Sequence, residues 1–320
     1  MLEPRQIGRS GLRVSPVCLG TANFGHVTDA PTAHRMLSRA LAEGVFFLDT
    51  ADIYNREELE NPSEVIIGRW FGEDRARRQR VVLATKVYGV TGEGANDRGL
   101  SARHIRLACE ESLRRLRTDW IDLYILHHVD RTVHWEETLD ALERLKTEGK
   151  ILYYGTSNFA AWQLTGLHLT ACVRNMFGPI SEQSPYSLAR REVESEVLPA
   201  CRHQGIGFLA YSPLAEGLLA GPDAGTRRTR PTTAKRRAQN AKRLDVWHEC
   251  CRNHGLAPSA AALGWVMSQP DVTAAVIGPR TEEQLDDAIA AASVPPDAAL
   301  LEAIAAEWPG PGVAPEAYAW

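Results

Sequence analysis

The chain has 320 residues, of which 44% are hydrophobic and 24% charged, and its formal net charge is −4. This balance is ordinary for a globular enzyme and gives no general attraction to nucleic acid. No apolar stretch approaches the roughly 20 residues that a membrane span needs, and residues 1–5 lack the profile of a secretion signal. We therefore expect a cytoplasmic protein that acts on a small molecule, without a nucleic-acid or membrane partner.

Short runs rich in β-branched residues alternate along the chain with longer segments of helical periodicity, which is typical of parallel strands joined by helices. Helix start signals stand at Pro31-Thr32, Ser101 and Glu192, and further helices are expected over 135–145, 259–267 and 281–291. The eight predicted strands cover residues 14–19, 45–48, 81–85, 121–126, 151–155, 179–182, 207–210 and 273–277. Eight such units predict an α/β fold, a (β/α)8 TIM barrel, as a single domain over residues 1–320.

A doubly wound open sheet is the competing architecture. Such a sheet carries G-x-G-x-x-G between its first strand and first helix when it binds a dinucleotide. Residues 19–25 do not supply this motif, and Gly92-Glu93-Gly94 follows a later strand and lacks the third glycine. The barrel is therefore favoured.

Two segments depart from the alternating pattern. A long loop is expected over residues 217–243, after the seventh strand, with basic runs at 227–230 and 235–237. We interpret the basic runs as a solvated face; a mobile flap that meets an anionic ligand is the alternative. From Trp308 onward the chain is rich in Pro, Gly and aromatic residues, which indicates a C-terminal docking tail.

Polar or glycine residues follow every predicted strand. Because the carboxyl ends of barrel strands meet at one rim, these residues are expected around a common site. They are Gly20-Thr21, Asp49 with Tyr54, Lys86, His127-His128, Ser157-Asn158, Gln183, Tyr211-Ser212, and Gly278 to Thr281.

Four of these residues suit proton transfer to a carbonyl. A tyrosine such as Tyr54 becomes a usable acid beside an ammonium, which Lys86 would supply. Asp49 would keep a buried Lys86 charged, and His127 would polarise a substrate oxygen. Each residue alone has a plainer interpretation: Asp49 as a helix cap, and Tyr54 and Lys86 as surface side chains. No nucleophile is paired with a base, so acyl transfer is not expected.

A metal site is not predicted. His127, His128, Asp130 and His134 are close in sequence, but His127 and His128 are expected to project to opposite sides of a strand end. No H-E-x-x-H or Cys/His spacing supports zinc. The six cysteines show no Cys-x-x-Cys spacing, and we assign them no chemistry.

The later strand ends suit a dinucleotide. Ser157, Asn158 and Gln183 offer donors and acceptors for a carboxamide, and Tyr211 offers a ring that can stack on a heterocycle. Arg280 and Thr281 could bind a phosphate at a helix start. The alternatives are N-cap roles for Ser157, Asn158 and Thr281, and rim packing for Tyr211.

In these residues the chain resembles the aldo-keto reductase superfamily from Gln6 to the C-terminus. The resemblance is carried by Leu48 to Tyr54, Ala84-Thr85-Lys86, Asp122 to His127, Gly155 to Phe159, Tyr211 to Leu214, and Gly278 to Leu285, in the family's order. It implies a catalytic tetrad of Asp49, Tyr54, Lys86 and His127, in which Tyr54 is the general acid.

The resemblance also implies NADPH as the cofactor. Ser157, Asn158 and Gln183 then hold the nicotinamide amide, and Tyr211 stacks on its ring. Gly217, Leu218 and Leu219 are expected near the pyrophosphate, and Arg280, Thr281 and Gln284 around the 2′-phosphate. The rest of the expected cofactor set is Gly20, Thr21, Ser212, Leu214 and Gly278. Ala288 stands where family members often have an asparagine that contacts adenine. This difference concerns the choice between NADPH and NADH as cofactor.

The tail and residues 127–131 are similar to those of actinobacterial members, some of which reduce nucleotide-linked keto-deoxyhexoses in antibiotic sugar pathways. A small carbonyl compound is thus the expected substrate, and homo-oligomer formation is left open. Two rival functions remain: a barrel aldolase with Lys86 as a Schiff-base lysine, and a cofactor-sensing regulatory subunit that resembles the channel β subunits. The lack of a long N-terminal extension argues against the latter.

Overall fold

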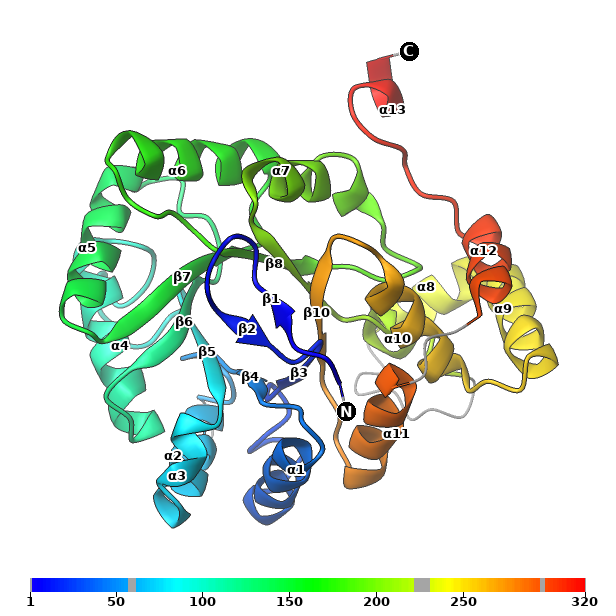
Figure 1. Ribbon diagram of the computed structural model, residues 1–320, viewed down its shortest axis with the longest axis horizontal. Coiled ribbons are helices and arrows are strands. Elements are labelled where there is room, and N and C mark those ends of the chain that lie inside the picture. Colours follow the sequence, from blue (N-terminus) through cyan, green and yellow to red (C-terminus); the bar gives the residue numbers. More distant parts are fainter. Residues whose placement is uncertain (1, 57–61, 222–230, 294–296, 320) are drawn as a thin grey trace.

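Eight parallel strands hydrogen-bond to one another in a closed ring, in the order β10-β3-β4-β5-β6-β7-β8-β9 (Figure 1). The computed structural model describes residues 2–56, 62–221, 231–293 and 297–319. The predicted (β/α)8 barrel and its eight strands are confirmed. The strands are β3 (Val17–Gly20), β4 (Phe47–Asp49), β5 (Val82–Val87), β6 (Ile121–Leu126), β7 (Ile151–Ser157), β8 (Ser181–Pro185), β9 (Gly207–Tyr211) and β10 (Val272–Ile277).

Helices surround the barrel and connect its strands. Two predicted starts are made by side-chain caps: Asp29, just before Pro31, accepts from the amide of Thr32, and Ser101 accepts from that of His104. The helices are α1 (Ala30–Ala42), α2 (Ser63–Glu73), α3 (Ala76–Gln79), α4 (Ala102–Leu116), α5 (Trp135–Thr147), α6 (Ala161–Val173), α7 (Val197–Gln204), α8 (Pro231–Gln239), α9 (Ala241–Asn253), α10 (Pro258–Ser268), α11 (Glu282–Ser293), α12 (Ala298–Glu307) and α13 (Glu316–Ala319), with 3-10 turns η1 (Glu192–Glu194) and η2 (Ala215–Gly217).

An antiparallel hairpin closes the amino-terminal end of the barrel. Strands β1 (Arg5–Gln6) and β2 (Arg13–Val14) pair with each other and lie across that end (Figure 1). The predicted strand over 14–19 is therefore wrong at its start, because Val14 belongs to the hairpin and the barrel strand begins at Val17. Pro16 separates the two, since proline lacks the N–H that a continuous strand would need.

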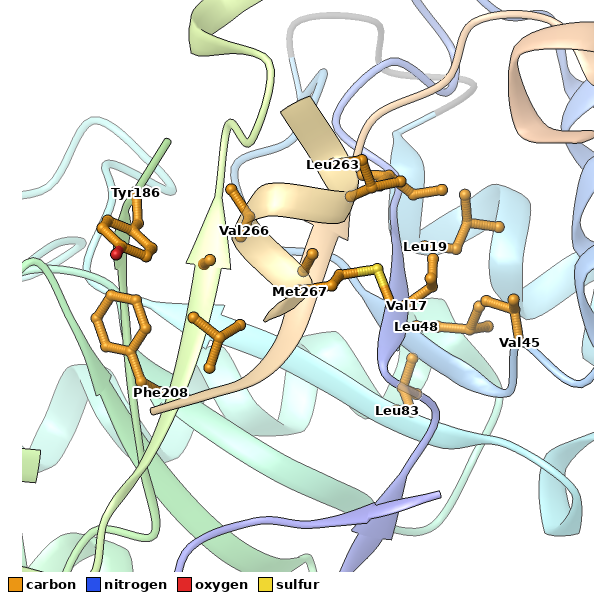
Figure 2. Close-up of a cluster of buried hydrophobic side chains, with 14 of the residues drawn as sticks. Val17, Leu19, Val45, Leu48, Leu83, Tyr186, Phe208, Leu263, Val266 and Met267 are labelled. Carbon is orange, nitrogen blue, oxygen red and sulfur yellow. The ribbon is translucent and has the colours of Figure 1, made fainter. Parts of the chain in front are cut away.

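Two apolar layers follow from the alternation of side chains along each strand. Cys18, Phe47, Leu123 and Leu209 face the barrel axis, where the hairpin residues Ile7 and Val14 complete the cluster. The intervening residues pack outward against the helices. Figure 2 shows part of this outer layer, with strand side chains such as Val17, Leu48 and Leu83 and the α10 side chains Leu263, Val266 and Met267.

The long loop predicted over 217–243 is wrong in the part that the structure describes. Residues 222–230, with the first basic run, lie outside the described residues, but the second basic run is on α8, and α9 begins at Ala241. Lys, Arg, Ala and Gln are good helix formers, so the charged stretch folds as an exposed helix. Arg236 of α8 forms an ion pair with Glu216, at 3.8 Å.

The C-terminal tail docks as expected. Trp308 is buried, its carbonyl accepts from Arg191, and the amide of Ala314 donates to the carbonyl of Ser195. Among the described residues no single helix is long and apolar enough to cross a membrane; α11 and α12 pass that test only as a bent pair.

Gly8 is expected to be the residue on which hairpin docking depends. Its φ is +51°, and a Cβ at this position would overlap backbone atoms of Gly205, Gly207 and Ile180. Gly8→Ala should therefore lower the free energy of unfolding by about 2–4 kcal/mol, combining left-handed strain with overpacking. Urea denaturation provides the measurement.

Gly149→Ala is the matched control. Gly149 has φ +72° but nothing within 4 Å of an added Cβ, so only the conformational cost of about 1 kcal/mol applies. Equal losses in the two variants would show that the hairpin contact is not tight.

Candidate active site

The inward-facing series of side chains turns polar at the carboxyl ends of the strands. On β4, Phe47 faces the axis and Asp49 follows it two residues later; on β5, Ala84 is followed in the same way by Lys86. Both charged side chains are buried, Asp49 at 2% exposure and Lys86 at 0%. Strand geometry therefore brings two opposite charges into a dry site.

The Lys86 ammonium uses all three of its N–H donors. Nζ donates to Oδ2 of Asp49 at 2.6 Å, to the carbonyl of Thr50 at 2.8 Å and to Oη of Tyr54 at 3.0 Å. Burial opposes the charge, but Asp49 and Tyr54 outweigh it and raise the pKa of Lys86 above its ordinary value. Lys86 is thus a fixed cation that contacts the tyrosine oxygen.

His127 lies beside the tyrosine as a neutral ring. The centroids of Tyr54 and His127 are 5.9 Å apart in an edge-on arrangement. Burial, followed by the charge of Lys86 and by His128, lowers the pKa of His127 to about 2. A neutral imidazole can donate one N–H hydrogen bond. Because it is not an imidazolium, it cannot serve as a proton donor at neutral pH.

The residues expected to hold a carboxamide form one hydrogen-bonded network. Tyr211 Oη donates to Oδ1 of Asn158, and Nδ2 of Asn158 donates to Ser157 Oγ and to the carbonyl of His127. Nε2 of Gln183 donates to Oδ1 of Asp49 at 2.9 Å. The structure therefore brings the expected cofactor residues of β7, β8 and β9 into contact with the tetrad.

A buried carboxyl group supports this rim from behind. Glu182 faces outward on β8 and accepts from Thr156, Ser184 and the amide of Phe159. Burial raises its pKa to about 7. These bonds fix the turn in which Asn158 adopts a left-handed φ of +61°, a conformation that is costly for a non-glycine residue and is concentrated at functional sites.

Several of the remaining expected cofactor residues shape the backbone at the strand ends. Ser212 (φ +55°), Gly217 (φ +91°) and the carbonyl of Leu214, which accepts from the amides of Gly217 and Leu219, form a tight turn after β9. Gly20 and Gly278 end β3 and follow β10.

Other members of the set have structural partners. The Thr21 hydroxyl is buried between Ser63 and the carbonyl of Asp49, and Leu219 is fully buried. Thr281 caps α11 through the amide of Gln284, whose own Oε1 accepts from the amide of Arg280. For Thr281 the plainer interpretation as an N-cap therefore describes its contacts.

Comparisons with known proteins agree with this geometry. The model of the Aldo/keto reductase family matches residues 16–307. The chain is 45% identical over the full length of both chains to an uncharacterized oxidoreductase, YrpG, of Bacillus subtilis (strain 168). It is also 34% identical to a probable voltage-gated potassium channel subunit beta of Oryza sativa subsp. japonica (92% of each chain) and 30% identical to the versiconal hemiacetal acetate reductase of Aspergillus parasiticus (92% of this chain, 93% of that one).

The chain belongs to the aldo/keto reductase family. It is accordingly an NAD(P)H-dependent oxidoreductase that reduces carbonyl groups.

Two features of the reductase site were missed or wrong in the sequence analysis. The carbonyl of Thr50 is a ligand of the ammonium, and a backbone acceptor leaves no signal in residue types. The rings of His127 and His128 stack at 5.9 Å rather than projecting to opposite sides. Strand β6 ends at Leu126, so the alternation of side chains does not extend to these two residues.

Asp52 is a second buried carboxyl group close to the tetrad. It is 2% exposed, and among the described residues neither of its side-chain oxygens has a hydrogen-bond partner. Burial, assisted by the charge of Glu64, raises the pKa of Asp52 to about 8. Burial therefore favours the neutral form of Asp52, whereas Asp49 is paired with the Lys86 ammonium.

The buried acid should make the stability of the reductase depend on pH. The folded pKa of Asp52 lies above its unfolded value of about 3.9, so stability is lost as pH rises from about 4 to 8. Asp52→Asn should remove this loss, gaining up to about 1.4 kcal/mol per pH unit relative to the wild type between pH 5 and 7.

Urea unfolding at several pH values measures this difference. Asp119→Asn, at an exposed aspartate, is the control and should leave the pH dependence unchanged. Parallel curves for the wild type and Asp52→Asn would contradict the assignment of a buried neutral acid.

Proposed function

We propose that this reductase uses NADPH to reduce an aldehyde, ketone or keto-sugar, with Tyr54 as the general acid. The observation that carries the proposal is the contact of the buried Lys86 ammonium with both Asp49 and Tyr54, at 2.6 and 3.0 Å. A cation at this distance stabilises the phenolate that remains after the proton has left. Tyr54 is thereby suited to donate a proton at neutral pH.

The residues of the tetrad divide the work between them. Tyr54 gives its proton to the substrate oxygen, while Lys86 neutralises the charge left on Oη. His127 is neutral, so its part is to orient the substrate oxygen through one N–H bond. Asp49 keeps the ammonium in place. When bound, the nicotinamide cofactor supplies the hydride to the carbonyl carbon.

The donor set at the rim fits a nicotinamide cofactor. Asn158 and Gln183 carry amides, Ser157 a hydroxyl and Tyr211 a ring, which together can bind a carboxamide and stack on a heterocycle. Near the start of α11, the Arg280 guanidinium and the Thr281 hydroxyl are side-chain donors suited to a phosphate, as in NADPH. Ala288, partly buried against the core, offers adenine no hydrogen bond. Because adenine is common to NADPH and NADH, the proposed preference for NADPH depends on recognition of the 2′-phosphate, which we assign to Arg280.

Lys86 is poorly suited to form a Schiff base. That chemistry needs a neutral amine with an accessible lone pair. Here the pKa of Lys86 is raised, the side chain is 0% exposed and its three donors are already used. The aldolase alternative is therefore not favoured.

A cofactor-sensing regulatory role is the second candidate. It is favoured by the 34% identity, over 92% of each chain, to a protein named as a probable potassium channel β subunit. Such a role predicts tight NADPH binding, negligible turnover with any carbonyl compound, and a stable complex with a larger partner. A panel of aldehydes, ketones and nucleotide-linked keto-deoxyhexoses, followed by NADPH absorbance, separates it from reduction.

Tyr54→Phe should abolish most turnover without affecting cofactor affinity. Loss of a positioned general acid lowers the rate by about 100-fold to 10,000-fold. The measurement is the single-turnover rate of NADPH oxidation with the best substrate of the panel, beside an NADPH fluorescence titration. Tyr318→Phe, in the exposed tail, should keep full activity. A Tyr54→Phe rate equal to that of the wild type would reject the assigned acid.

The pH profile of reduction should lack an acidic limb from His127. Because the pKa of His127 is about 2, its charge does not change between pH 5 and 8. The single-turnover rate should instead fall only on the alkaline side, where Tyr54 loses its proton. A fall in rate as pH rises through about 6.5 that disappears in His127→Asn would show instead that a protonated His127 is the acid.

A further inference from the structure

The geometry points to Gln183 as a positioning residue that couples the nicotinamide carboxamide to the proton donor, through Asp49 and Lys86. This inference rests on the proposed function, and it adds a role for Gln183 beyond holding the cofactor. It concerns the hydrogen bond from Nε2 of Gln183 to Oδ1 of Asp49.

The bond spans the barrel. In the closed ring, β4 and β8 are separated by three strands on either side, so they lie opposite each other. Asp49 is the last residue of β4, and Gln183 lies in β8, 134 positions along the chain. Both side chains face the axis at the same rim. A direct side-chain bond therefore joins the cofactor side of the site to the acid side.

The orientation of the Gln183 amide follows from the chemistry of its partner. A carboxylate only accepts hydrogen bonds, so Nε2 must face Asp49 and Oε1 must face away. Because Nε2 is used by Asp49, Oε1 is the atom of the amide that is left to accept from a ligand. An acceptor held in this way is matched to the N–H₂ group of a carboxamide.

Gln183 also completes the environment of the catalytic carboxylate. Asp49 is 2% exposed; Oδ2 accepts from Lys86 and Oδ1 from Gln183. Both carboxylate oxygens are thus held by donors. A buried carboxylate that loses one donor must move or accept a hydrogen bond from another group. The ammonium depends on Asp49 for its position against Tyr54, so a change at Gln183 is transmitted to the acid.

Gln183→Glu separates coupling from simple cofactor binding. In its protonated form the introduced carboxyl group can still donate to Asp49, whereas in its ionised form it places a like charge beside that residue. The titratable groups around this position are Asp49, Lys86, Tyr54, His127 and Tyr211, with Glu182 on the opposite face of β8. Coupling predicts that the single-turnover rate of Gln183→Glu rises at least tenfold from pH 8 to pH 6, and that NADPH binds more weakly as pH rises.

Two further variants complete the experiment. Gln183→Met keeps the length of the side chain without a donor; its rate should fall about tenfold or more, with the alkaline limb displaced by about one pH unit. Ser157→Ala removes an expected carboxamide contact without touching Asp49, so it should weaken NADPH binding and leave the shape of the pH profile unchanged. Circular dichroism confirms that each variant is folded.

Other outcomes overturn the coupling. If Gln183 only holds the carboxamide, the ionised carboxylate of the Gln183→Glu variant accepts from that group at least as well. Both the rate profile and the pH dependence of the NADPH dissociation constant then match the wild type, and Gln183→Met resembles Ser157→Ala. A wild-type protein that turns over no carbonyl compound rejects the proposed function instead, and NADPH titrations of Gln183→Glu across pH still decide the coupling.

Discussion

The buried ammonium of Lys86 is the constraint on which the rest of the site depends. Removing a lysine side chain from water favours the neutral amine, and only opposite charge and well-placed acceptors reverse that preference. Here Asp49, the carbonyl of Thr50 and Oη of Tyr54 supply them. A cation held by three fixed acceptors needs little reorganisation when charge develops on the tyrosine oxygen, and such preorganised electrostatics is a major source of catalytic rate.

The barrel supplies this arrangement through the two-residue period of its strands. Phe47 on β4 and Ala84 on β5 face the axis in the apolar layer. Asp49 and Lys86 follow them two residues later on the same strands, so they face the axis nearer the carboxyl ends. The apolar layer and the hairpin close the amino-terminal end of the barrel, so the two charged side chains border apolar residues on that side. The outward positions hold a second polar set, of which Glu182 is the clearest case. The two-residue period of the strands thus separates the inward polar layer of the candidate site from an outward layer that supports it.

Much of this could be predicted from the sequence, because strands and helix caps are encoded locally. All eight barrel strands were found, and Asp29 and Ser101 cap helices where start signals stand. The differences have local causes as well. Pro16 marks the boundary between the hairpin and β3, and the residues of the second basic run are helix formers although their charge pattern predicts a loop. What residue types do not encode is long-range partnership. The bond between Gln183 and Asp49 depends on barrel closure, which places residues 134 positions apart against each other.

Asp49 and Asp52 show how environment overrides residue type. They are three positions apart, equally buried, and indistinguishable by chemistry. Asp49 accepts from the ammonium and from an amide donor. The Asp52 carboxyl group has no donor among the described residues, and burial, followed by the charge of Glu64, raises its pKa to about 8. One loop thus pairs one carboxyl group with a cation and favours the neutral form of its neighbour. A second negative charge near Lys86 would compete with Tyr54 for the field of the ammonium, so a neutral Asp52 would leave that field directed at Tyr54, the proposed acid.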